Sequence, residues 1–126
     1  MTTSVSREAL ADRIAAYVRE HDHVSFAQLV DDFPEFSGGD CSVVHEGRKH
    51  SNIVLWTGMT KTATDAYAMA LRSGRVTATP TSPVTYLLDG RALKLPIAKT
   101  ARHYQKARWL PVVLRPGADK FRRVLL

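Results

Sequence analysis

Apolar residues recur at helical spacing close to the start of the chain. Their spacing follows a 3.6-residue period and predicts a helix over residues 6–19, with Ser6 as the N-cap because its hydroxyl can accept a hydrogen bond from a first-turn N–H. Glu8 would lie in the first turn, where the helix dipole favours negative charge. The residues that define the apolar face are Leu10, Ile14, Tyr17 and Val18.

Two further helices follow from capping signals and apolar spacing. The run Ser25-Phe26-Ala27-Gln28 fits a capping box, and the short apolar face behind it ends at Pro34. A third helix is predicted to start at Thr60 or Thr62 and to end before Gly74. Its apolar positions are Ala63, Ala66, Tyr67, Ala70 and Leu71.

Three β-hairpins are expected between and after these helices. Residues 41–44 and 52–56 are rich in strand-forming side chains and predict the first hairpin, with Trp56 in the core. Residues 75–79 and 84–88 flank a proline-rich turn and predict the second. The basic stretch 99–108 can be a helix or a tether, and residues 110–114 and 121–126 frame residues 115–120 as a last hairpin.

These elements predict an α+β fold. It has a three-helix core with β-hairpins, one of them inserted between the second and third helices, and a C-terminal β-hairpin. At 126 residues, of which 44% are hydrophobic, the chain has the size of one domain. We expect residues 1–95 to form this domain and residues 96–126 to be a basic extension packed on it.

Composition narrows the cellular setting. The first residues lack the pattern of a secretory signal, and no apolar run reaches the roughly 20 residues needed to cross a bilayer. We therefore expect a soluble, cytoplasmic protein without membrane contact. A single cysteine, Cys41, excludes an internal disulfide and makes a structural zinc site improbable, so no metal or cofactor is expected.

Charge is distributed very unevenly along the chain. Counted as Lys and Arg minus Asp and Glu, residues 1–40 carry −5, residues 41–90 carry +2 and residues 91–126 carry +9, within a total of +6. Solubility needs only a net charge different from zero, so this separation points to an anionic partner. Tyr104 and Trp109 lie among the C-terminal cations and could stack on bases of a single strand, or Trp109 could instead anchor this segment to the core.

The order of three helices and a hairpin resembles the winged helix-turn-helix class of DNA-binding domains. The resemblance spans about residues 6–90 and rests on the three helical patterns, on the segment Leu71-Arg72-Ser73-Gly74-Arg75-Val76 and on the strand-like Val84-Thr85-Tyr86-Leu87. Residues 34–59 depart from it, because this class joins the second and third helices by a short turn. The resemblance implies a non-catalytic DNA-binding protein, a transcriptional or plasmid or phage maintenance regulator, that commonly acts as a dimer.

Candidate DNA contacts follow from this interpretation. The start of the third helix can reach base edges or hold a phosphate, while cations around the wing and in the C-terminal segment would follow the backbone of a duplex, which is favoured over RNA. The candidates are Lys61, Thr62, Arg72, Arg75, Arg91, Lys94, Lys99, Arg102, Lys106, Arg108, Arg122 and Arg123, with Arg48, Lys49 and His50 as further phosphate contacts.

Two alternatives use the same residues differently. His45 and His50, with Glu46 between them and Arg48 close by, match the inventory of a metal-independent ribonuclease or of an RNA-binding protein. Alternatively, the basic surface could bind an acidic protein surface, as an adaptor or an inhibitor would.

Overall fold

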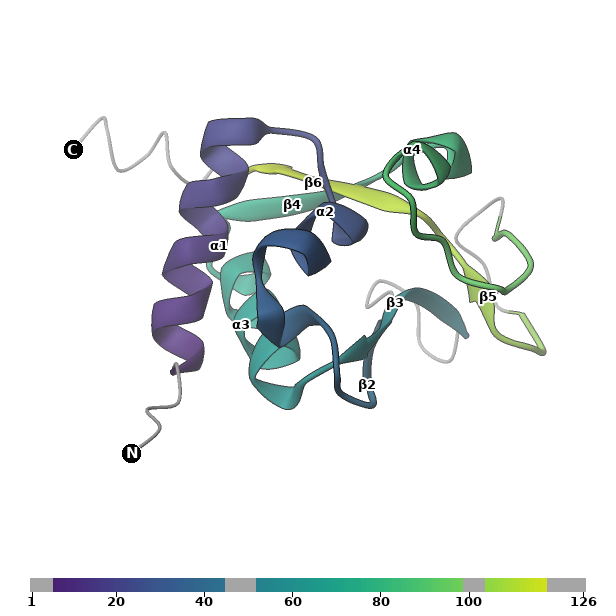
Figure 1. Ribbon diagram of the computed structural model, residues 1–126, viewed down its shortest axis with the longest axis horizontal. Coiled ribbons are helices and arrows are strands. Elements are labelled where there is room, and N and C mark those ends of the chain that lie inside the picture. Colours follow the sequence, from purple (N-terminus) through teal and green to yellow (C-terminus); the bar gives the residue numbers. More distant parts are fainter. Residues whose placement is uncertain (1–5, 45–51, 99–103, 118–126) are drawn as a thin grey trace.

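The computed structural model describes residues 6–44, 52–98 and 104–117. This part of the chain contains four α-helices, one 3₁₀ helix and two three-stranded sheets, so the α+β class is confirmed (Figure 1). In chain order the elements are α1 (Arg7–His21), β1 (Val24–Ser25), α2 (Phe26–Asp32), the 3₁₀ helix η1 (Pro34–Phe36), β2 (Cys41–Val44), β3 (Ile53–Met59), α3 (Lys61–Arg72), β4 (Val76–Pro80), α4 (Pro83–Leu88), β5 (Arg108–Trp109) and β6 (Val112–Pro116).

The predicted starts of the first three helices are confirmed by their caps. The Ser6 hydroxyl accepts from the Ala9 N–H at 3.0 Å, and the Thr60 hydroxyl accepts from the Ala63 N–H at 3.2 Å. Ser25 accepts from the Gln28 N–H at 3.0 Å, which is the first half of the expected capping box. The Gln28 side chain extends to α1, where its amide donates to the Tyr17 hydroxyl at 3.1 Å, and no bond from the Ser25 N–H to Gln28 is seen among the described residues.

The two sheets have different origins. The hairpin of β2 and β3 is the one expected from the sequence, and β5 adds to it in parallel. The other sheet has the order β1-β6-β4, so its central strand comes from the end of the described chain and pairs antiparallel with both neighbours. Residues 112–116 are thus integral to the domain rather than an appendage.

The prediction of a second hairpin strand at residues 84–88 is wrong, because these residues form the helix α4. Ser82 caps it by accepting from the Val84 N–H at 3.1 Å, and Pro83 occupies the first helical position, where its missing N–H costs nothing. Only Tyr86 of this helix is fully buried, while Leu88 is 82% exposed. The β-forming composition of the segment is therefore overridden by a local Ser-Pro helix start and one inward side chain.

The expected C-terminal hairpin also needs correction. Arg115 and Pro116 belong to strand β6 rather than to a turn, and β6 pairs with β4 over five residue pairs. The second strand expected at residues 121–126 lies outside the described residues. Strand β4 therefore pairs with β6 and not with residues 84–88.

Two glycines with distinct roles lie at the base of the β4–β6 strand pair. Gly74 ends α3 in the left-handed region at φ 79°, and two bonds of a Schellman motif close the helix there, from Gly74 N to Leu71 O and from Arg75 N to Ala70 O, each 3.1 Å. Gly117 lies against this turn, where a Cβ would stand only 1.9 Å from the Gly74 carbonyl oxygen. This close approach therefore requires glycine at 117.

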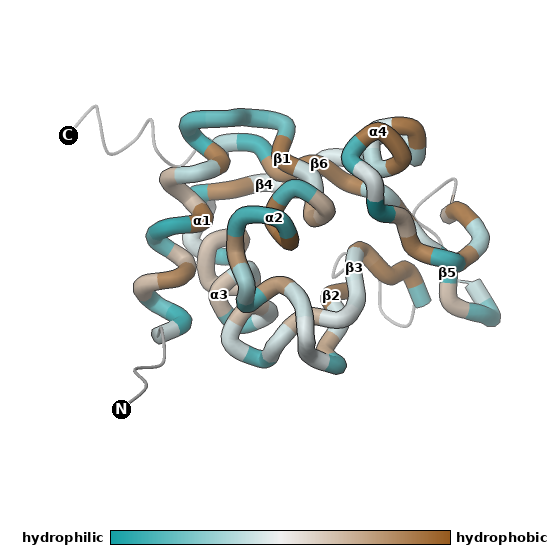
Figure 2. The backbone as a smooth tube through the Cα atoms, in the orientation of Figure 1, coloured by the Kyte–Doolittle hydropathy of each residue, from teal (hydrophilic) through white to brown (hydrophobic). Residues whose placement is uncertain are grey.

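The core contains a cluster of aromatic rings between α2, α3 and the two sheets. Trp56 is 5% exposed, as expected for a core residue, and its ring centroid lies 5.3 Å from that of Tyr86. Trp109 packs edge-on against Tyr86 at 5.1 Å, and Phe26 lies 5.3 Å from Tyr67. Figure 2 shows hydrophobic stretches along β4, β6 and β3, and also in α4, where Leu87 and Leu88 are exposed.

The Tyr86 hydroxyl connects three separate segments. It donates to the Val112 carbonyl of β6 at 2.6 Å and accepts from the Phe26 N–H at the start of α2 at 3.0 Å. Burial raises the pKa of Tyr86, so its proton is retained at neutral pH. Beside it, the Ser25 hydroxyl donates to Asp89 at 2.5 Å. These bonds fix α4 to the helical core.

We expect Tyr86→Phe to lower the free energy of unfolding by about 1–3 kcal/mol, because it leaves a buried N–H and a buried carbonyl without this partner. Urea denaturation followed by tryptophan fluorescence measures the change. Tyr17→Phe is the matched control, since the Tyr17 side chain is only half-buried and removal of its hydroxyl should cost less. Equal effects in the two variants would contradict the central role of Tyr86.

Candidate nucleic-acid interface

The outer side of α3 carries two cations on one stripe. Lys61 and Arg72 are both exposed and lie eleven residues apart, close to three full turns, so they project from the same side of the helix about 16 Å apart along its axis. The opposite side is buried through Ala63, Ala66 and Ala70 and faces the core. Thr62, another candidate contact, is half-buried.

An acid divides this stripe. Lys61 Nζ lies 2.8 Å from Asp65 Oδ2, one turn along the helix, and Arg7 of α1 lies 3.7 Å from the same oxygen. The hydrogen bond from Lys61 is the main reason that the pKa of Asp65 is lowered, so this carboxylate stays ionised at neutral pH. A phosphate approaching α3 would therefore meet a negative charge between the two cations.

Three arginines from the second half of the chain are bound by carboxylates of the first 40 residues. The pairs are Arg75 Nη1 with Asp12 Oδ1 at 2.6 Å, Arg91 Nη2 with Asp31 Oδ1 at 3.1 Å, and Arg115 Nε with Asp22 Oδ1 at 3.1 Å. Arg75 and Arg91 are among the candidate DNA contacts. Their side chains instead tie β4 and the segment after α4 to the two N-terminal helices.

The pair of Arg115 and Asp22 has two bonds. Besides Nε, Arg115 Nη2 donates to Asp22 Oδ2 at 3.2 Å, which gives the two-pronged geometry that a guanidinium makes with a carboxylate. The bonds from Arg115 lower the pKa of Asp22, and the bonds to Asp22 raise the pKa of Arg115. Both groups stay charged across the neutral range.

The remaining described candidates lie in the segment that leads from α4 to β5 and in β5 itself. Lys94 and Lys106 are exposed, whereas Arg108 is half-buried, donates to the Ile97 carbonyl at 3.2 Å and lies 4.8 Å over the ring of Tyr104. Tyr104 and Trp109 are 6% and 2% exposed. Neither ring can stack on a base, and the interpretation of Trp109 as a core anchor is confirmed.

Several candidate residues lie outside the described residues. They are the phosphate contacts Arg48, Lys49 and His50 with the second histidine His45, and the C-terminal contacts Lys99, Arg102, Arg122 and Arg123. Their assignment remains a prediction from sequence, and so does the ribonuclease alternative that depends on the two histidines.

Sequence reasoning missed Arg7, which reaches α3 through Asp65, and Arg115, which binds α1 through Asp22. The separation of acids and bases along the chain was the available signal. An acidic half and a basic half of one small domain pack against each other, so part of their charge is paired internally.

No matching family model, curated protein or solved structure was found for this chain. Within residues 6–44, 52–98 and 104–117, no group of three or more His, Cys, Asp or Glu side chains is placed to hold a metal ion. In the same ranges, none of the helices combines the length and apolar character required to cross a membrane.

We expect the pKa of Asp22 to rise towards its ordinary value in Arg115→Ala, because the variant lacks the two bonds that favour the carboxylate. Because the pKa of Asp22 is lowered in the folded wild type, the Asp22–Arg115 pair stabilises the fold above the unfolded-state pKa of about 3.9, and this stabilisation disappears as the pH falls through the folded-state pKa. Carboxyl ¹³C NMR titration measures the pKa of Asp22 in each protein. Arg91→Ala is the control and should leave the Asp22 titration in place.

Proposed function

We propose that this protein binds duplex DNA as a non-catalytic regulator, and that it does so as a winged-helix domain. In this proposal α3 faces the major groove, and the strand pair β4–β6 forms the wing. The connection between the two wing strands, residues 81–111, contains α4 and β5.

The observation that carries the proposal is the path of the chain after α3. The helix ends at Gly74, the chain turns directly into β4, and β4 pairs antiparallel with β6. The resemblance to winged helix-turn-helix domains rests on this order, in which three helices are followed by an antiparallel pair of strands. The wing is expected to consist of β4 and β6 rather than of the adjacent segments first expected from the sequence.

Burial of the aromatic residues favours a duplex over a single strand. Single-strand binding depends on exposed rings on which bases stack, and the two candidate rings, Tyr104 and Trp109, are inside the core. A duplex needs only cations along its backbone and a helix face that fits a groove. Lys61, Arg72, Lys94 and Lys106 are exposed, and the chain carries a net charge of +6, which supports binding to a polyanion.

The first test is fluorescence anisotropy with a labelled duplex of random sequence at several salt concentrations. Most non-specific affinity comes from counterion release, so binding at low salt should weaken steeply as salt increases. Lys61→Ala with Arg72→Ala should lower affinity and reduce the slope of log Kd against log salt by about 0.9 for each phosphate that the variant no longer neutralises.

Asp65→Asn provides the opposite change on the same helix. It removes the negative charge between the two cations and should tighten DNA binding, whereas Asp32→Asn removes an equal charge from the end of α2 and should change affinity less. No binding at low salt would refute the proposal and favour an adaptor. Cleavage of labelled RNA that disappears in His50→Ala would favour the ribonuclease alternative.

A further inference from the structure

The outer face of α1 carries opposite charges at matching intervals. Arg13 and Glu20 lie seven residues apart on one flank of this face, and Asp12 and Arg19 lie seven residues apart on the other. All four side chains are exposed. In Figure 1, α1 stands at the edge of the domain, with α3 and the β1-β6-β4 sheet on its inner side.

These charges are only partly used within the domain. Among the described residues, neither Glu20 nor Arg19 forms an ion pair, and the Arg13 guanidinium lies 5.0 Å over the ring of Phe33. Asp12 binds Arg75, yet its side chain is 74% exposed and keeps accessible oxygen atoms. The face therefore presents two cations and two anions to an external partner.

The arrangement is complementary to itself. When a second copy of α1 lies antiparallel across the first, Arg13 comes opposite the partner's Glu20, and Arg19 comes opposite the partner's Asp12. The midpoint between Arg13 and Glu20 and the midpoint between Asp12 and Arg19 both fall next to Ala16. Ala16 is exposed and small enough for two helices to cross closely there. A two-fold axis through this point forms each of these two ion pairs twice.

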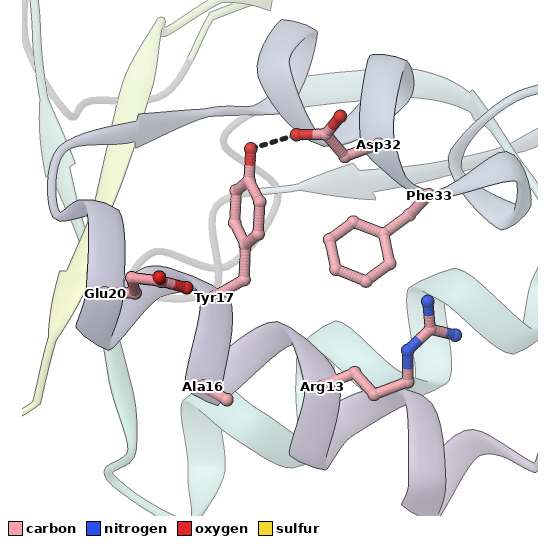
Figure 3. Close-up of a pocket in the computed structure, with 6 residues that line it drawn as sticks. All are labelled: Arg13, Ala16, Tyr17, Glu20, Asp32 and Phe33. Atoms are coloured by element: carbon pink, nitrogen blue, oxygen red, sulfur yellow. Dashed lines mark hydrogen bonds between the residues drawn. The ribbon is translucent and has the colours of Figure 1, made fainter.

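On the side of this face that is turned towards α2, a hollow can accommodate the Arg13 side chain of a second copy. The hollow, of about 380 Å³, is lined by Arg13, Ala16, Tyr17, Glu20, Asp32 and Phe33. Figure 3 shows Glu20 and Arg13 extending from α1 on either side of Tyr17, with Asp32 and Phe33 opposite them. Asp32 accepts a hydrogen bond from the Tyr17 hydroxyl, so its carboxylate is held at the hollow. The two carboxylates suit a guanidinium of a partner.

We infer that α1 is the self-association surface of this protein, and that two copies pair antiparallel through it with the partner's Arg13 entering the hollow beside Glu20. This pairing does not depend on DNA binding. It rests largely on exposed charges, so it is a weak dimer that dissociates at high salt.

Sedimentation velocity of the full chain tests the pairing. The wild type should show a monomer–dimer equilibrium at about 0.05 M NaCl that shifts towards monomer at about 0.5 M. Arg13→Glu and Glu20→Arg should each raise the dimer Kd by about tenfold or more, because each places like charges opposite one another twice. Lys94→Glu and Asp40→Arg, which make the same charge changes elsewhere, should leave it nearly unchanged.

Recombination of the charges gives the decisive result. The double variant R13E/E20R should restore self-association, and a mixture of the R13E and E20R single variants should form a heterodimer tighter than either homodimer. Circular dichroism melts confirm that each variant is folded. A wild type that stays monomeric at low salt, or a mixture no tighter than its components, would overturn the inference, whereas failure to bind DNA would not affect it.

Discussion

The Tyr86 hydroxyl is the interaction on which the arrangement of this domain depends. Residues 81–111 connect strands β4 and β6. A connection of this length packs in one arrangement on the core only if specific contacts hold it there. Tyr86 packs its ring against both Trp56 and Trp109, and its hydroxyl satisfies backbone groups of both α2 and β6. The ring buries apolar surface, and the hydrogen bonds of the hydroxyl fix its orientation. Together they hold α4 in one position relative to the core.

Local signals were readable from the sequence, and long-range ones were not. Ser6, Ser25 and Thr60 marked helix starts because a cap acts within three residues, and the apolar stripe of α1 required only helical periodicity. The strand partner of β4 could not be read, because pairing with β6 depends on residues more than thirty positions away. In residues 84–88 the β-forming side chains suggested a strand, but burial of Tyr86 alone is equally compatible with a short helix.

The candidate site shows the same division. Exposure of Lys61 and Arg72 followed from the periodicity of α3, since an alanine stripe must face the core. Internal pairing of Arg75, Arg91 and Arg115 depends on which acids the fold brings beside them, and charge counting along the chain does not contain that information. Part of the charge that is separated along the sequence is therefore paired internally among the described residues.

The position of β6 in the sheet has a consequence for synthesis of the protein. It is the middle strand of the three, yet it is the last of them to leave the ribosome. A nascent chain that ends before residue 112 holds complete segments for β1 and β4 with no strand between them, and Tyr86 lacks the carbonyl to which it donates. This sheet consequently cannot form before residues 112–116 have been synthesised and are free to pair with β1 and β4.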